Sequence, residues 1–169
     1  MIDVEDFLDD IETMLRARLP AQIAAVEARK VAAGKGVGLP AIPAEVTSEN
    51  GTSTPWMRQT LDENFAQFPV GILFGVEKIE PQGEGPFTVK KVTFFAEVYM
   101  IDGKSDNHGV RRMLRYSQAL LEVCEKHYAA NRLGATTKIS SSEPISFRLN
   151  SETSEEVRVG GVKLVATFT

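Results

Sequence analysis

A stretch from Phe87 to Ile101, FTVKKVTFFAEVYMI, constrains the fold of this chain more than any other. Along it, apolar side chains recur at every second position. One face would carry Val92, Phe94, Ala96, Val98 and Met100, and the other Thr93, Phe95, Glu97 and Tyr99. A period of two residues is that of a β-strand with an apolar face turned to a core. The sequence therefore predicts a sheet whose apolar face is covered by other elements.

Three further segments have the composition of strands. The apolar, β-prone segment 68–80, FPVGILFGVEKIE, is joined to 87–101 by the turn-forming residues 81–86, which predicts a hairpin. The remaining two strands are expected at 139–150 and 157–169, with the polar turn NSETSEE between them. In the last strand, Val162, Leu164, Ala166 and Phe168 alternate with Lys163, Val165 and Thr167.

A helical period precedes the strands. Apolar side chains recur at intervals of three and four residues from Val4 to Leu15, and acidic residues occupy the first turn, where the helix dipole favours anions. Pro20 is expected to stop or kink this helix, because its ring clashes with the preceding turn. A second helical stretch would then begin at Pro20 and end at Ala33 and Gly34.

A second long helix is predicted from Val110, with Asp106 or Asn107 as its N-cap and Gly134 at its end. Its apolar stripe is expected to consist of Val110, Met113, Leu114, Ser117, Leu120, Leu121 and Cys124. Arginines would lie beside or opposite that stripe, namely Arg111, Arg112 and Arg115. Two interpretations of these arginines stay open: a solvated face, or an electrostatic contact with an acidic neighbour, either the first helix or another subunit.

The order of elements is helix, long loop, two strands, helix and two strands, which is typical of an α+β protein. We expect a mostly antiparallel or mixed four-stranded sheet packed by the N-terminal helix and the second long helix. The chain has 169 residues, of which 43% are hydrophobic and 25% charged, so it is large enough to bury one core. Residues 1–169 are therefore expected to form a single domain.

Residues 34–55 are rich in Gly, Pro, Ser and Thr and separate the first helical part from the strands. Gly34, Gly36 and Gly38 invite comparison with phosphate-binding loops, but those loops need a strand before them, a helix after them and a different glycine spacing. Loops this long inside a compact domain are commonly functional or disordered. Segment 34–55 is therefore expected to be a flexible arm, followed by a short helical turn within 56–65.

No catalytic or metal-binding pattern is apparent in the sequence. Cys124 and His127 stand three residues apart, but Cys124 continues the apolar stripe and is expected to be a small buried hydrophobe. One cysteine and two histidines, His108 and His127, are too few for the usual zinc sites. No serine stands in a G-x-S-x-G elbow. We therefore expect a protein that is not an enzyme, with no catalytic residue, no metal site and no cofactor.

Charge and cysteine content bound the surroundings of the chain. A net charge of −4 argues against a protein that grips nucleic acid by neutralising phosphates. A single cysteine excludes an internal disulfide, which fits a reducing compartment. The acidic beginning of the chain and the lack of a long apolar run argue against a signal peptide and against a membrane helix. A soluble protein made in the cytoplasm is expected.

The succession of segments resembles that of the tail terminator (tail completion) proteins of long-tailed bacteriophages and of their neck relatives. The similarity lies in a helix ending LRARLPAQIAAVEARK, a Gly/Pro loop, FPVGILFGVE, a strand VTFFAEVYMID, the helix RRMLRYSQALLEVCEKH and two last strands. The phrases LPAQIAAVEA and RYSQALLEV carry it most directly, and neither is a catalytic motif.

The resemblance implies a virion structural protein at the tail–head junction, made in the host bacterium. Copies would form a hexameric ring on the tail tube protein, end tail growth and contact the head–tail connector, while DNA passes through without being held tightly. Family members have long loops that become ordered in the ring, which would explain segment 34–55. A ring pairs two different surfaces of each copy, and an acidic first helix would complement a basic second one. Candidate interface residues are Gly34, Lys35, Gly36, Gly38, Trp56, Asp6, Asp9, Asp10, Arg111, Arg112 and Arg115.

Two other classes of function stay open. A small soluble enzyme or ligand-binding α+β domain would have a deep pocket with convergent polar groups, and segment 34–55 would close over it as a lid. An intracellular adaptor would instead bind a protein partner along an exposed sheet edge.

Overall fold

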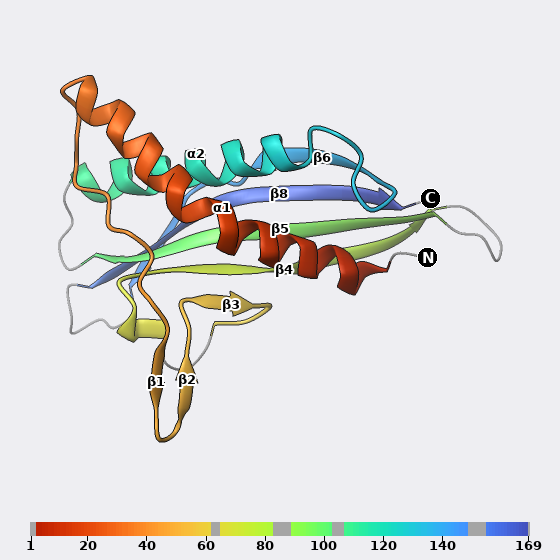
Figure 1. Ribbon diagram of the computed structural model, residues 1–169, viewed down its shortest axis with the longest axis horizontal. Helices are drawn as coiled ribbons and strands as arrows, with labels where there is room; N and C mark the ends of the chain where they lie inside the picture. Colours follow the sequence, from red (N-terminus) through yellow and green to blue (C-terminus); the bar gives the residue numbers. More distant parts are fainter. Residues whose placement is uncertain (1–2, 62–64, 83–88, 103–106, 149–154, 169) are drawn as a thin grey trace.

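The computed structural model describes residues 3–61, 65–82, 89–102, 107–148 and 155–168 (Figure 1). Its elements are, in chain order, α1 (Val4–Ala32), β1 (Val46–Ser48), β2 (Gly51–Ser53), β3 (Trp56–Arg58), the 3-10 turn η1 (Phe65–Gln67), β4 (Val70–Gln82), β5 (Val89–Asp102), α2 (Asn107–His127), β6 (Ala135–Ser141), β7 (Ile145–Arg148) and β8 (Glu156–Phe168). The predicted α+β class is confirmed. The main sheet, however, has six strands in place of the expected four.

The main sheet is mixed. Its strands follow the order β3-β4-β5-β8-β6, and β7 also pairs with β8. β3 runs parallel to β4, whereas the other pairs are antiparallel. The predicted hairpin is confirmed by the register of β4 and β5, from Val70 opposite Met100 to Gln82 opposite Val89. Its turn residues, 83–88, lie outside the described residues, as do residues 149–154 between β7 and β8.

The strand expected at 139–150 is divided in two. β6 pairs with residues 162–168 of β8 and β7 with residues 156–159, so that they follow one another along the same edge. Pro144 stands between them and has no N–H to donate, which interrupts the ladder. Residues 149 and 150 lie outside the described residues.

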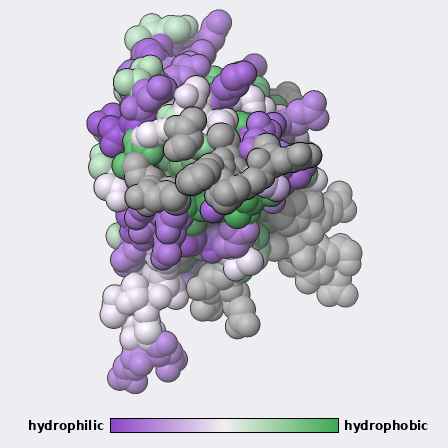
Figure 2. All heavy atoms as spheres, turned by 90° about the vertical axis from the view of Figure 1, so that its right-hand side faces the viewer, coloured by the Kyte–Doolittle hydropathy of each residue, from purple (hydrophilic) through white to green (hydrophobic). Residues whose placement is uncertain are grey.

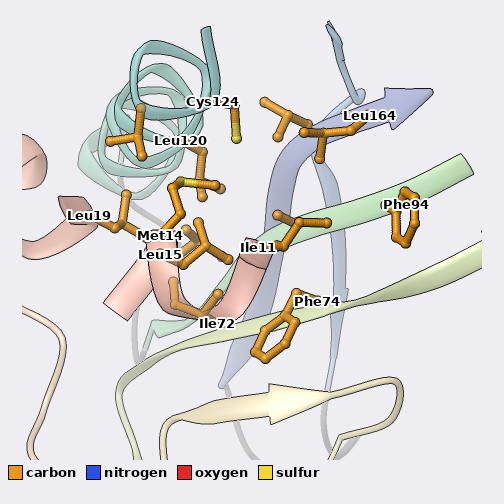
Figure 3. Close-up of a cluster of buried hydrophobic side chains, with 14 of the residues drawn as sticks. Ile11, Met14, Leu15, Leu19, Ile72, Phe74, Phe94, Leu120, Cys124 and Leu164 are labelled. Atoms are coloured by element: carbon orange, nitrogen blue, oxygen red, sulfur yellow. The ribbon is translucent and has the colours of Figure 1, made fainter. Parts of the chain in front are cut away.

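The alternation of β5 and β8 is confirmed. Val92, Phe94, Ala96 and Val98 are fully buried, and so are Val162, Leu164 and Ala166 on the neighbouring strand. This face of the sheet packs against both helices. Figure 3 shows side chains of α1 between the sheet and α2, with Ile11 and Leu15 near the sheet and Leu120 and Cys124 on the second helix. The ring of Phe7 stacks on that of Phe94, with 4.7 Å between the two ring centroids.

α1 continues through Pro20, so the prediction of two separate helical stretches is wrong. Proline inside a helix costs about 3 kcal/mol, because a hydrogen bond to the preceding turn is lost. The buried side chains of Leu19, Ile23 and Val26 continue the inward face beyond Phe7 and Ile11. Burial of each contributes about 1.5–3 kcal/mol, which outweighs the cost of the proline. The predicted helix end is confirmed, with Ala33 as the cap.

α2 turns a different face to the core from the one expected. Met113, Leu120 and Cys124 of the predicted stripe are buried, but Val110 and Leu114 are 48% and 52% exposed. Tyr116, Ala119 and Val123 are buried in their place. The helix begins at Asn107 and ends at His127, seven residues before Gly134. Gly134 (φ 69°) belongs to the turn that leads into β6. Asp106, the other expected cap, lies outside the described residues.

Residues after the loop form a strand where a helical turn was expected. Trp56–Arg58 pair in parallel with Ile72–Phe74 as β3, and Phe65–Gln67 form a 3-10 turn. Trp56 packs against the main core on the helix side, and the Arg16 guanidinium lies 5.5 Å from the centre of its ring. This candidate interface residue is therefore engaged within its own chain.

Candidate interaction surface

The three glycines after α1 reverse the chain. Gly34 and Gly38 adopt the left-handed backbone conformation, with φ of 70° and 65°. Gly36 lies so near α1 that a Cβ atom there would be 2.9 Å from Cγ2 of Val31. These positions bring residues 35–40 back against α1 and α2, so the glycines serve a tight return of the chain.

Side chains of both helices hold the returning segment by its backbone. Glu27 accepts hydrogen bonds from the N–H groups of Val37 (2.9 Å) and Gly38 (3.0 Å). Arg115 donates to the carbonyl of Lys35, and Arg112 donates to that of Val37 over 3.2 Å. The Tyr116 hydroxyl donates to the Pro40 carbonyl (2.5 Å). The first part of segment 34–55 is thus packed on the body.

Glu27 and Arg115 form the ion pair at the centre of this arrangement. Their side chains are 15% and 8% exposed, and Arg115 Nη1 lies 2.5 Å from Glu27 Oε2. Burial raises the pKa of Glu27, but hydrogen bonds from the Val37 amide and from Arg115 outweigh it and hold the pKa below its ordinary value. Arg115 therefore forms its ion pair within its own chain. Of the two open interpretations, the electrostatic contact with an acidic neighbour holds for this arginine. The acidic neighbour is the first helix.

A cavity of about 380 Å³ opens beside this pair. It is lined by Lys30, Lys35, Arg111, Leu114, Arg115 and Gln118. Lys30, Lys35 and Arg111 make no ion pair with any residue that the structure describes. We call this cavity the basic pocket. It gathers positive charge from the end of α1, the returning segment and α2.

Exposed apolar side chains adjoin the basic pocket. Val31 is 58% exposed and directly follows Lys30 of the pocket lining, and Leu114 lies in the pocket wall. Val110, one helical turn before Leu114, is also exposed. Basic residues around an apolar centre are the composition of a surface that binds an acidic, partly apolar partner.

The carboxylates of the first helix have separate roles. Asp3 and Asp6 form a capping box at the start of α1. Asp9 pairs with Arg58, with Oδ1 and Nη2 2.6 Å apart. Asp10, another of the candidate interface residues, is turned inward and is engaged within its own chain. The first-turn residues Asp3, Glu5 and Asp6 are exposed.

Asp10 joins α1 to the end of α2. Its carboxylate is 2.9 Å from His127 Nε2 and 3.1 Å from both the Tyr128 hydroxyl and Arg132 Nη2. Burial raises the pKa of Asp10, but hydrogen bonds from Arg132 and His127 more than offset it, so the pKa lies below its ordinary value. His127 therefore partners Asp10.

Cys124 is fully buried, as predicted, and burial raises the pKa of its thiol to about 12.

Replacing Asp10 with asparagine is expected to flatten the acid side of the stability profile. A carboxyl whose pKa is lowered by folding stabilises the protein above its unfolded pKa, near 4, and loses that contribution as the pH falls through its folded value. At pH 7 the variant should lose roughly 2 kcal/mol, because three donors lose a charged acceptor. Urea denaturation between pH 7 and pH 3 measures both effects. A wild-type slope below pH 4 that the variant retains would contradict this role of Asp10.

A second cavity, of about 240 Å³, lies on the face of the sheet opposite the helices. It is lined by Leu61, Leu73, Glu97, Tyr99, Ile145 and Val159. The lining is apolar apart from Glu97, whose pKa burial raises despite the nearby charge of Lys163. Such a cavity has few polar groups to orient a substrate.

Glu27 and Lys30 are not among the candidate residues that the sequence indicated. Both follow the last buried residues of α1, in a stretch rich in alanine. Glu27 stands four residues after the buried Ile23, and that spacing could have placed it on the inner side of the helix. Lys30 gave no comparable signal, because an exposed lysine in the last helical turn is ordinary.

Comparisons with known proteins leave the chain unassigned. No protein-family model matches it, and no curated protein matches its sequence significantly. Among the described residues there is no group of three or more histidine, cysteine, aspartate or glutamate side chains placed to hold a metal ion. Nor is either described helix long and apolar enough to cross a membrane.

Proposed function

We propose that this chain is a structural subunit of the tail–head junction of a long-tailed bacteriophage. As a tail terminator, it forms a hexameric ring on the head-proximal end of the tail tube, ends tail growth and joins the tail to the head connector. The sequence resemblance motivates this function. One structural observation supports it most: a hairpin that extends away from the body of the subunit.

The hairpin consists of β1 and β2, residues 46–53, which pair only with each other among the described strands. Seven of its eight residues are exposed, including Val46. Figures 1 and 2 show it extending below the rest of the molecule, with a hydrophilic tip. An isolated two-stranded hairpin is marginally stable in water. Contact with a neighbouring copy would stabilise it, because its outer edges have unpaired backbone groups.

The charge of the chain agrees with a ring through which DNA passes. With a net charge of −4, the subunit has no general affinity for phosphate backbones.

The alternative function is a small ligand-binding or enzymatic domain with segment 34–55 as a lid. The basic pocket favours it to the extent that Lys35 of that segment lies on its wall. In this case the ligand would be a small anion. The ring remains the better-supported function, because the hairpin extends away from this pocket and a lid does not account for it.

Removing the hairpin tests the ring directly. Joining Glu45 to Thr54 through two glycines should leave a folded protein that no longer forms rings. The ends to be joined are close, since Thr54 Oγ1 donates to Glu45 Oε1 over 2.9 Å. Folding should be retained because residues 46–53 contribute no buried side chain. Circular dichroism measures the fold, and negative-stain electron microscopy with and without tails measures the assembly.

The matched control replaces Glu49 and Asn50 at the hairpin tip with glycine and serine, which keeps its length. Removal of all of residues 35–54 would be a poorer test, because it would also remove hydrogen-bond partners of three residues in the helices. Arg112 and Arg115 would lose the backbone carbonyls to which they donate, and Glu27 would lose a backbone amide from which it accepts. A variant without the hairpin that still forms rings on tails would contradict the proposed role of the hairpin.

A further inference from the structure

The basic pocket has an unsatisfied excess of positive charge. Lys30, Lys35 and Arg111 line a single cavity. Two carboxylates are bonded to other lining residues, and both are already engaged: that of Glu27 by Arg115 and two backbone amides, and that of Glu122 by Gln118 and Arg29. Like charges gathered within a Debye length, about 8 Å at physiological salt, repel one another. An acidic group placed in the pocket would remove that repulsion.

The same helix offers a complementary acidic group at its other end. Asp3, Glu5 and Asp6, in the first turn of α1, are exposed and have no basic partner among the described residues. α1 has 29 residues and is therefore about 43 Å long. Figure 1 shows its two ends at opposite sides of the molecule. One copy cannot bring its own acidic turn to its own basic pocket.

We infer that the basic pocket binds the first turn of α1 from a second copy of this chain. The carboxylates of Glu5 and Asp6 lie against Lys30, Lys35 and Arg111. Leu114 and Val31 contact the methylene groups of the Glu5 and Asp6 side chains. Each copy uses one surface to bind and a different one to be bound, so the contact is head-to-tail and generates a ring or a filament. This inference rests on the proposed ring and names the two surfaces that build it.

Complementary charge reversal tests the contact. The first variant carries Lys35→Glu and Arg111→Glu, which reverse the charge of the pocket at two exposed side chains. The second carries Glu5→Lys and Asp6→Gln, which change the net charge of residues 3–6 from −3 to 0, put a lysine where a carboxylate would enter the pocket, and keep an acceptor for the capping hydrogen bond from the Asp3 amide. The control carries Lys90→Glu and Lys138→Glu, on exposed positions of β5 and β6.

Sedimentation velocity over a range of concentrations measures the result. Wild type and control should associate alike, whereas either variant alone should associate at least tenfold more weakly. An equimolar mixture of the two variants should recover association in part, because the acidic pocket of one then meets the lysine that Glu5→Lys puts in the first turn of the other. Their second contact, between the unchanged surfaces, is that of the wild type. Raising the salt concentration should weaken association of the wild type and of the mixture.

Three results would overturn the contact. Unchanged association of either variant would remove its residues from the interface, and a mixture that fails to assemble would exclude direct pairing of the two surfaces. Binding of inorganic phosphate or of a DNA duplex that the first variant loses, with assembly unchanged, would assign the pocket to a free anion or a nucleic acid. In all three cases wild-type rings persist on tails. A wild type that forms no ring there contradicts the proposed function itself.

Discussion

Replacing Gly161 with alanine is expected to lower the free energy of unfolding by about 3 kcal/mol or more, which is the upper end of the range for overpacked cores. A Cβ atom at this position would lie 2.1 Å from the carbonyl oxygen of Ala96 and 2.7 Å from Cα of Glu97. Both atoms belong to the backbone of β5, the paired neighbour of β8. Neither can rotate away, so the two strands must separate. Urea denaturation at pH 7 measures the loss.

Gly160→Ala is the matched control, since it makes the same change one residue earlier in β8. Its Cβ would meet Ser117 Oγ at 2.7 Å and Met113 Sδ at 3.0 Å, which are side-chain atoms of α2. Because these side chains can change rotamer, this variant should lose only about 1 kcal/mol. Equal losses in the two variants would contradict the distinction between a backbone and a side-chain contact.

Replacing Glu27 with alanine is expected to cost about 3 kcal/mol and to release residues 35–40 from the body. The change leaves the buried Arg115 guanidinium without a carboxylate, and the amides of Val37 and Gly38 without their acceptor. Urea denaturation measures the loss of stability. Relative to the wild type, the amide hydrogen-exchange rate should increase more at Val37 and Gly38 than in the rest of the chain.

Two comparisons separate the ion pair from a general effect of losing a charge. Glu125→Ala, on an exposed position of α2, should change the free energy of unfolding by less than about 0.5 kcal/mol. A double variant, Glu27→Gln with Arg115→Met, should be more stable than Glu27→Ala, because it leaves no buried charge unpaired. A double variant that is less stable would show that the guanidinium contributes mainly through its bond to the Lys35 carbonyl.

Local patterns were sufficient where a side chain faces the same environment along a whole element. The alternation from Val92 to Met100 predicted the buried face of β5, and the same pattern held in β8. The burial of Cys124 followed from its place among apolar residues. Glycine after the last helical turn also predicted the end of α1.

The candidate site could be predicted only in its parts. Three residues that the sequence indicated, Lys35, Arg111 and the buried Arg115, do line the basic pocket. The sequence did not indicate that these residues lie near Lys30, or that Asp10 is turned away from the surface. Asp10 is held by His127 and Arg132, more than a hundred residues away in the chain, and such partners leave no trace in local periodicity.

The sequence by itself determined the class of fold, the faces of its central strands and the acidic start of α1, because these depend on neighbours within a few residues. Tertiary structure alone decided that α1 continues through Pro20, which face of α2 is buried and that Glu27 binds Arg115. Each of these depends on how much apolar surface and charge two distant segments bury together. That free energy exceeds the local preference of a proline, a leucine or an arginine, and it exists only once the segments are in contact.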